Sequence, residues 1–294
     1  MVKNLTAIQT HKARLWGDLA ILASALFFYL STAVVRWGQG RVAIDAAYYV
    51  FARFVFGIVM VGAVMAAGRT GLKIRSYHLL LGRAVFNCVA VYCFYKAVAL
   101  TTVAEGNILN MTFPLFVALF SWIFLKKQRD PKAIVMVVVA FIGVWLVLAP
   151  EWTVLKTGSL WGLVSGVTAA VAILYLNLSR RDHDTNTILF FMFGIGAVTI
   201  YALYHRHIFL PGPTEIFYLA LCAGLGVIGQ YLLTIGFRYV TAVEGSIVSS
   251  ARILMAALLG PVLVGDPALT SAGWLGAFLI FGANIYLAVR KVSA

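Results

Sequence analysis

The sequence predicts an all-α integral membrane protein of ten transmembrane helices, arranged as two inverted five-helix repeats. Three observations lead to this fold class: the composition, a series of long apolar segments and an internal repeat. The 294 residues are 62% hydrophobic and only 11% charged, and their mean hydropathy is +0.95. Soluble domains carry about 25% charged residues, so this chain has too little charge to cover a water-facing surface. The composition excludes an ordinary soluble enzyme.

Ten apolar segments are long enough to cross a bilayer. A helix needs about 20 residues to cross a hydrocarbon core about 30 Å thick, and short polar or Gly/Pro-containing breaks separate the segments. We expect the spans at 16–36, 45–67, 76–99, 102–125, 132–149, 159–179, 186–204, 214–237, 241–264 and 271–289. The first span follows basic residues, as a signal peptide would, but its apolar run is too long and no A-x-A cleavage site follows it. We therefore expect it to stay in the protein.

The basic residues predict the orientation of these spans. The 23 Lys and Arg outnumber the 10 Asp and Glu, and the net charge is +13. In a soluble protein this excess would suggest nucleic acid, but here the basic residues lie between the apolar segments, so we expect no nucleic-acid partner. With a cytoplasmic N-terminus, fifteen of the 23 fall on the cytoplasmic side and five on the other. This positive-inside bias predicts ten spans with both termini in the cytoplasm.

An internal repeat divides the chain into two similar halves. A shift of 139 positions aligns residues 102–106 (TVAEG) with 241–245 (TAVEG), and a shift of 145 aligns 15–17 with 160–162, both LWG. We expect one transmembrane domain, 1–294, with repeat one at 1–150 and repeat two at 151–294. Because each repeat has an odd number of spans, the second begins on the opposite side of the membrane. Inverted repeats are typical of secondary transporters, although some channels have them too.

Several motifs give the sequence a family resemblance. They are the paired T-x-x-E-G helix starts, Pro114 within the fourth span, and residues 265–267 (GDP) followed by 274–277 (WLGA). With these motifs the chain resembles, over nearly its whole length, the ten-helix drug/metabolite transporter (DMT) superfamily of the EamA type. By overall similarity it is most like the YddG-type exporters of aromatic and other hydrophobic amino acids in the bacterial inner membrane.

The resemblance implies spans one to four and six to nine around a central cavity, with spans five and ten at the edge. Two positions depart from the symmetry of the halves. Lys126 and Lys127 stand where the second half has Gly265 and Asp266, and Pro114 corresponds to Ile253. Symmetric roles are therefore not expected for the two halves.

The two repeated T-x-x-E-G helix starts each contain a carboxylate. Thr102 with Glu105, and Thr241 with Glu244, have the spacing of a capping box, in which the hydroxyl and the carboxylate bind backbone N–H groups at the helix start. We interpret these four residues as structural caps, with proton coupling as the alternative. Because no carboxylate lies clearly at mid-depth, movement of solute down its own gradient is the simpler expectation.

Three arginines lie within the predicted spans. Arg252 is about twelve residues into the ninth span, near the bilayer midplane, where an unpaired guanidinium is costly. It either faces a watery cavity and binds a substrate carboxylate or is held by a carbonyl or Asn of a neighbouring helix. Arg53 and Arg83 are nearer the helix ends, and we expect them to extend to the membrane interface.

Polar and aromatic side chains in the cavity-forming spans complete the predicted substrate site. Lipid offers polar groups no partners, although interhelical hydrogen bonds or simple packing explain most of these residues equally well. The candidate substrate-binding residues are Asn87, Tyr92, Asn110, Phe113, Tyr175, Gln230, Ser246, Ser250 and Arg252.

These features predict an exporter or facilitator of small amphipathic metabolites, in particular aromatic and other hydrophobic amino acids. Alternating access would use Pro114 as a hinge, and the partners would be the lipid bilayer and the small-molecule substrate. The alternatives are an antiporter of phosphorylated sugars or nucleotide sugars, which would need two or more cavity cations, and a channel or lipid-modifying enzyme. Hydrolase and nucleotide-binding motifs are absent and 205–207 (HRH) lacks further ligands, so we expect no enzyme activity, cofactor or metal.

Overall fold

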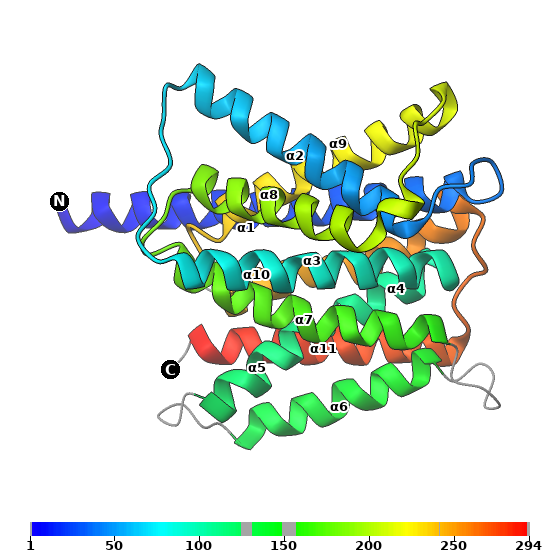
Figure 1. Cartoon of the computed structure of the whole chain (residues 1–294). Coiled ribbons are helices and arrows are strands. Elements are labelled where there is room, and N and C mark those ends of the chain that lie inside the picture. The colour runs from blue at the N-terminus through cyan, green and yellow to red at the C-terminus, as the bar shows by residue number, and fades with distance from the viewer. Residues whose placement is uncertain (1, 125–130, 149–156, 241, 293–294) are drawn as a thin grey trace.

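The computed structural model describes the backbone of residues 2–124, 131–148, 157–240 and 242–292. Within these ranges the chain forms helices and no strand (Figure 1). The helices are α1 (Val2–Gly38), α2 (Ala46–Ala67), α3 (Tyr77–Leu100), α4 (Val103–Asn110), α5 (Phe113–Phe124), α6 (Pro131–Leu148), α7 (Thr157–Ser179), α8 (Thr185–Tyr204), η2 (His205–His207), α9 (Pro213–Gly236), α10 (Ala242–Leu259), η3 (Gly260–Val264) and α11 (Ser271–Val292).

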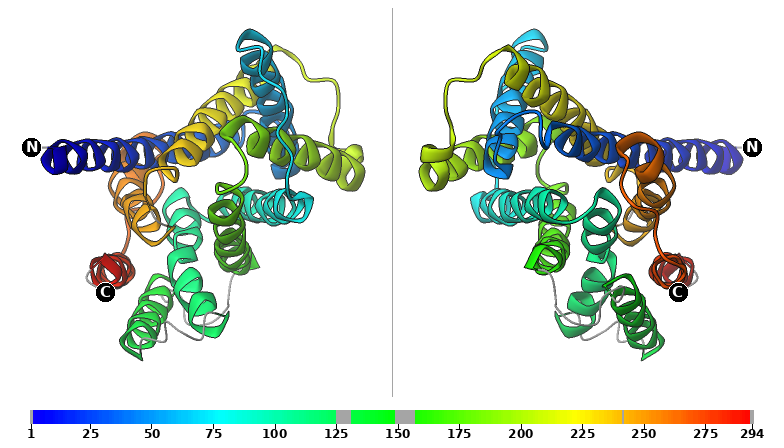
Figure 2. Two further views of the ribbon diagram at one scale, coloured as in Figure 1. Left: turned by 90° about the vertical axis from the view of Figure 1, so that its left-hand side faces the viewer. Right: turned by 90° about the vertical axis from the view of Figure 1, so that its right-hand side faces the viewer.

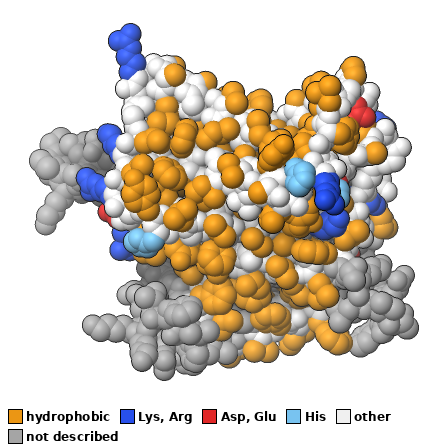
Figure 3. Space-filling view, in the orientation of Figure 1, with side chains coloured by type: hydrophobic (Ala, Val, Ile, Leu, Met, Phe, Trp, Pro, Cys, Tyr) orange, Lys and Arg blue, Asp and Glu red, His pale blue; other side chains and the backbone are white. Residues whose placement is uncertain are grey.

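The surface of this bundle is apolar. In Figure 3 hydrophobic side chains cover the face shown, and most of the coloured charged side chains lie toward its two ends. Val59, Val198 and Leu203 are 62%, 71% and 69% exposed, an arrangement that suits lipid and not water. Six of the described helices are long and apolar enough to cross a membrane, and α6, α10 and α11 contain shorter apolar stretches. The exact number of ten spans remains a prediction.

The fourth predicted span, 102–125, is not one helix. It is broken at Met111 and Thr112, between α4 and α5. Pro114 has no N–H with which to bind the carbonyl four residues earlier, that of Asn110, so the helix cannot continue regularly. The Thr112 hydroxyl instead donates to the Leu109 carbonyl at 2.7 Å. In the second half, α10 runs on without such a break, past Ile253, into the π-helical segment η3.

Two glycines of α7 allow the broken segment to approach closely. A Cβ added at Gly162 would lie 2.8 Å from the Cβ of Leu109, and one at Gly166 would lie 2.9 Å from the Leu109 carbonyl oxygen. Small residues at this spacing let two helices pack backbone to backbone. The G-x-x-x-G motif of α7 therefore holds the break in α4–α5 near the middle of the molecule.

The contacts between helices repeat when the two halves are exchanged. α1 packs along α9, and α3 packs along α7. Because α1 corresponds to α7 and α3 corresponds to α9, exchanging the two halves turns the first contact into the second. α2 packs on its counterpart α8, and α6 packs on its counterpart α11 at one edge of the molecule (Figure 2). In Figure 1, α1 starts on the left whereas α7 starts on the right. The described halves are thus related as inverted repeats, and the start of α1 and the end of α11 lie on the same side.

Candidate functional site: a central cavity

A cavity lies between the two halves, and the empty space within it and in its opening to solvent amounts to about 630 Å³. Its walls come from α1, α2, α3, α7, α9 and α10 and from the broken segment between α4 and α5. α8, which corresponds to the seventh expected span, contributes none of the residues that line it. The polar part of the lining consists of arginine, amide and serine side chains, and phenylalanine and aliphatic side chains form the rest.

Five of the nine predicted substrate-binding residues line this cavity. They come from three parts of the chain that are distant in sequence: Asn87 from α3, Asn110 and Phe113 from the broken fourth span, and Gln230 and Arg252 from α9 and α10. The break places Asn110 and Phe113 on either side of Met111, which also faces the cavity.

Three of the predicted residues lie elsewhere. The Tyr92 ring stacks on Tyr204, with centroids 4.8 Å apart, and the Tyr175 ring stacks on Phe86 at 5.9 Å. Ser250 accepts a hydrogen bond of 2.8 Å from the Asn284 side chain on α11. Helical periodicity alone could not distinguish these packing faces from the cavity face, since both are buried. The Ser246 side chain lies outside the described residues.

Arg53 and Arg83 also line the cavity, so the prediction that they extend to the membrane interface is wrong. They are 3% and 2% exposed, and both turn inward. Their positions near the ends of the predicted spans suggested the membrane interface, but the helix face on which they lie indicates the interior better. On α2, Arg53 shares a buried stripe with Val50, Gly57 and Val61, which are spaced three to four residues apart.

The guanidinium groups of Arg53 and Arg252 share one aromatic neighbour. The Arg53 Cζ lies 5.1 Å, and the Arg252 Cζ 5.6 Å, from the centroid of the Phe28 ring, which also lines the cavity. Arg53 donates to the Tyr95 hydroxyl at 3.2 Å, and Arg252 donates to the Asn110 side-chain oxygen. Arg252 thus combines the two arrangements considered for it, since it faces the cavity and is held by an Asn of a neighbouring helix.

The Thr102 part of the predicted cap is present at the start of α4. The Thr102 hydroxyl oxygen accepts a hydrogen bond of 3.0 Å from the Glu105 N–H. The Glu105 carboxylate accepts one of 2.5 Å from the Ser159 hydroxyl of α7. Neither residue lines the cavity. Of the corresponding pair in the second half, Thr241 and the side chain of Glu244 lie outside the described residues.

Hydrogen bonds between helices close the cavity toward the C-terminal end of α1. One turn beyond Phe28, the Ser31 hydroxyl lies 2.7 Å from the Tyr95 hydroxyl of α3 and donates to the Cys222 carbonyl of α9 at 3.0 Å. Asn107 of α4 donates to the Thr32 hydroxyl at 3.2 Å. We call these groups the closing layer: Ser31, Thr32, Tyr95, Asn107 and Cys222.

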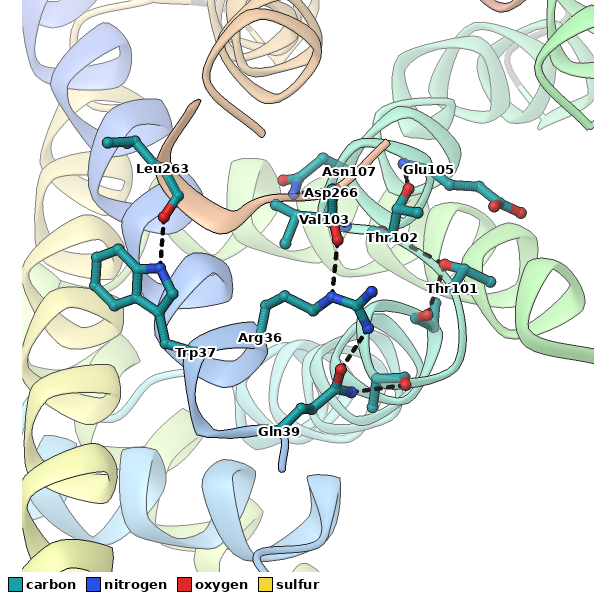
Figure 4. Close-up of polar contacts among 12 residues, drawn as sticks. Arg36, Trp37, Gln39, Thr101, Thr102, Val103, Glu105, Asn107, Leu263 and Asp266 are labelled. Atoms are coloured by element: carbon teal, nitrogen blue, oxygen red, sulfur yellow. Dashed lines mark hydrogen bonds and ion pairs between the residues drawn. The ribbon is translucent and has the colours of Figure 1, made fainter. Parts of the chain in front are cut away.

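An ion pair lies beyond the closing layer, at the end of α1. The Arg36 Nε donates to the Asp266 carboxylate at 2.8 Å, and the other oxygen of that carboxylate accepts from the Val103 N–H at the start of α4 at 2.7 Å (Figure 4). The Asp266 side chain is only 1% exposed. Trp37 adds a hydrogen bond of 2.7 Å to the Leu263 carbonyl (Figure 4). This cluster ties α1, α4 and the segment after α10 together.

The family follows from a comparison with known proteins. The model of the EamA-like transporter family matches the chain twice, over residues 15–149 and 156–289. The chain belongs to the EamA-like transporter family. It is therefore a multi-pass membrane transporter, and the expected DMT-superfamily resemblance is confirmed at this level.

The chain is similar along most of its length to several proteins. It is 27% identical to the pseudopaline exporter CntI of Pseudomonas aeruginosa, over 76% of this chain and 78% of that protein. It is 23% identical to a riboflavin transporter of Rhizobium johnstonii, over 97% and 95% of the two chains. A solved crystal structure matches its fold with a TM-score of 0.63 at 20% identity, over 97% of this chain and 99% of the other. These relatives indicate a transporter and not an enzyme, and they do not support the finer resemblance to YddG-type exporters.

Proposed function

We propose that this EamA-family chain is a secondary transporter of the bacterial inner membrane that moves small amphipathic metabolites through its central cavity by alternating access. The observation that carries the proposal is a cavity between two inverted halves that is closed on one side by hydrogen bonds between helices. Both termini would lie in the cytoplasm, so the closing layer would separate the cavity from the opposite side of the membrane.

Alternating access requires the closing layer to open while the other side closes. The two halves have equivalent contacts, so each can adopt the arrangement that the other has now. The break at Pro114 supplies a point where α4 can tilt relative to α5, because the helical hydrogen bond to the Asn110 carbonyl is missing there. Tilting α4 would separate Asn107 from Thr32 and Val103 from Asp266 in one movement.

The cavity lining suits a solute with an apolar body and polar ends. Phe28, Phe94 and Phe113 provide an aromatic wall, and the amide groups of Asn87 and Gln230 provide hydrogen bonds. The expected aromatic amino acids fit the aromatic wall and remain one candidate class. The relatives that are named for pseudopaline and riboflavin favour a broader range of amphipathic metabolites.

The described lining contains no Asp or Glu, which favours movement down the solute gradient over proton coupling inside the cavity.

The lining also contains enough cations for an anionic solute, which the sequence analysis did not expect. A phosphorylated substrate requires several cavity cations, and Arg53 and Arg83 join Arg252 in this cavity. An antiporter of phosphorylated metabolites is therefore a stronger alternative than the sequence indicated.

Flux from liposomes tests the proposal without prior choice of solute. Proteoliposomes loaded with a small-molecule cell extract are washed, and the solutes that leave are identified by mass spectrometry. We expect the protein to release a limited set of amphipathic solutes, and Ala169→Phe, which fills the cavity wall on α7, to abolish their release. Val171→Phe adds the same ring on α7 away from the lining and serves as the control. Flux that survives Ala169→Phe, or single-channel currents, would refute alternating access through this cavity.

A further inference from the structure

We propose that the cavity selects solutes that carry at least two negative charges, as carboxylate or phosphate groups, on an apolar body, and that Arg53, Arg83 and Arg252 bind those charges. This inference rests on the proposed function, because it assumes that the cavity is the transport site. It goes beyond that function by assigning the chemical class of the solute.

The first argument is the charge of the cavity. Arg53, Arg83 and Arg252 are 3%, 2% and 5% exposed, and the described lining offers them no carboxylate. Guanidinium groups stay charged, and burying a charge without a counter-charge is strongly unfavourable. Three like charges around one space add mutual repulsion. An anionic solute would remove both costs when it enters.

The second argument is the set of unused donors. Within the described part of the chain, no group accepts a hydrogen bond from Arg83, and the Nε atoms of all three arginines have no partner. Among the described residues, the side-chain hydrogen bonds of Arg53 and Arg252 go to neutral oxygens, those of Tyr95 and Asn110. Arginine presents its donors as a planar fork that matches carboxylate and phosphate. The cavity therefore contains more cationic donors than the protein itself satisfies.

The third argument is the contrast with Arg36 in the same chain. Arg36 is tied to the buried carboxylate of Asp266 at 2.8 Å, which is how a structural arginine is neutralised inside a membrane protein. The three cavity arginines are more deeply buried than Arg36, yet among the described residues no carboxylate lines their cavity. A structural role alone leaves this difference without a cause, whereas a negatively charged ligand explains it.

Two glycines of α9 make room for this arrangement. A Cβ on Gly226 would lie 2.9 Å from the Arg53 Nε, and a Cβ on Gly229 would lie 3.0 Å from the Phe28 ring. Both the Arg53 and the Arg252 guanidinium groups lie within 6 Å of the Phe28 ring centroid. A solute with an apolar part against Phe28 and two anionic groups could therefore meet both arginines at once, which a single anion could not do as well.

A ligand series with one shared phenyl group tests the charge requirement on the full-length wild-type protein. The probes are phenylsuccinate (two carboxylates), 3-phenylpropionate (one carboxylate), phenylalanine (zwitterion) and phenethylamine (cation), with phenyl phosphate to distinguish phosphate from carboxylate recognition. Binding is measured by calorimetry in lipid nanodiscs. We expect phenylsuccinate or phenyl phosphate to bind about 10-fold or more tighter than 3-phenylpropionate, since each charge-assisted contact accounts for about a factor of ten. Equal or tighter binding of the single anion, the zwitterion or the cation would overturn the proposal.

Arg83→Gln tests the role of the arginine with the most unused donors. We expect it to weaken binding of the dianion about 10-fold, to change binding of phenylalanine little, and to raise the melting temperature of the ligand-free protein because a repelling charge is removed. Arg181→Gln removes an exposed arginine and should change neither. A fall in melting temperature with unchanged ligand preference would show that Arg83 is structural and refute its assignment. If the variant does not fold, Arg83→Lys, which keeps the charge but loses the fork, provides the same comparison.

The two proposals fail in different ways. Protein-dependent release of solutes that Ala169→Phe blocks, together with no preference for dianions, would leave the transport function intact and refute this inference alone. If Ala169→Phe does not affect solute release, the proposed function is refuted. Any dianion binding would then have no connection with transport through the cavity.

Discussion

Arg36 and Asp266 form a contact between a partly exposed guanidinium and a nearly fully buried carboxylate. Asp266→Ala would leave both the Arg36 Nε and the Val103 N–H without this acceptor. We expect a loss of about 2 kcal/mol of stability, measured as a lower thermal unfolding midpoint in detergent. Because the cluster ties α1 to α4, the closing layer should also open more often, so that the native Cys222 of this layer reacts faster with a thiol reagent in the Asp266→Ala variant.

A double-mutant cycle isolates this pair. Arg36→Ala combined with Asp266→Ala should cost less than the sum of the single changes, since the second change removes a partner that is already gone. Lys96→Ala is the control, because Lys96 and Asp45 are 3.5 Å apart and both about 30% exposed, and such a pair contributes at most about 1 kcal/mol. Additive losses for Arg36 and Asp266 would show that the two side chains are not coupled.

Gly224 and Gly226 are two residues apart on α9 but have different surroundings. A Cβ on Gly224 meets no atom within 4 Å, whereas one on Gly226 meets the Arg53 side chain at 2.9 Å. Gly224→Ala should therefore raise stability by about 1 kcal/mol through helix propensity and leave ligand binding unchanged. Gly226→Ala should displace the Arg53 guanidinium and weaken phenylsuccinate binding. Unfolding midpoints and calorimetry of both variants check this, and equal binding by the two would contradict it.

At the scale of the elements, the break between α4 and α5 carries a prediction of its own. Pro114→Ala supplies the N–H that can bind the Asn110 carbonyl, so the fourth span should become a more regular helix. We expect higher thermal stability together with slower solute release, because the restored helical hydrogen bond would stop α4 from tilting relative to α5. Pro213→Ala, at the first position of α9 where proline suits the helix start, should change neither quantity. Faster release by Pro114→Ala would argue against a hinge at this position.

The helices themselves were largely predictable from the sequence. Apolar length sets where α2, α3 and α9 begin and end, and their bounds lie within one residue of the predicted spans. The break in the fourth span was not predicted as two helices. Pro114 indicated a weak point, but whether a proline kinks or interrupts a membrane helix depends on what packs against it. Here Gly162 and Gly166 on α7, from the other half of the chain, let the broken segment pack closely.

At the scale of the whole molecule, the cavity shows what the sequence could not provide. Polar residues within spans, such as Asn87 and Gln230, were identified because lipid offers them no partners. Arg53 and Arg83 were misplaced because depth along a helix does not tell which way a side chain faces. That direction follows from the packing of α2 and α3 against the opposite half, in particular from the space at Gly226. The stripe of Val50, Arg53, Gly57 and Val61 on α2 indicates an inward direction for Arg53, but periodicity does not reveal the contact with Gly226 in the other half.

The orientation of the molecule can be tested with two single cysteines. Leu72, 40% exposed, lies between α2 and α3, and Leu210, 96% exposed, lies between α8 and α9. The native Cys88, Cys93 and Cys222 are buried and should react slowly. If the positive-inside distribution sets the topology, an impermeant maleimide should label Leu210→Cys in whole cells and Leu72→Cys only after permeabilisation. The opposite pattern would show that the membrane orientation is reversed. Labelling of both cysteines in whole cells would contradict the predicted spans, because five of them separate the two loops and place these on opposite sides of the membrane.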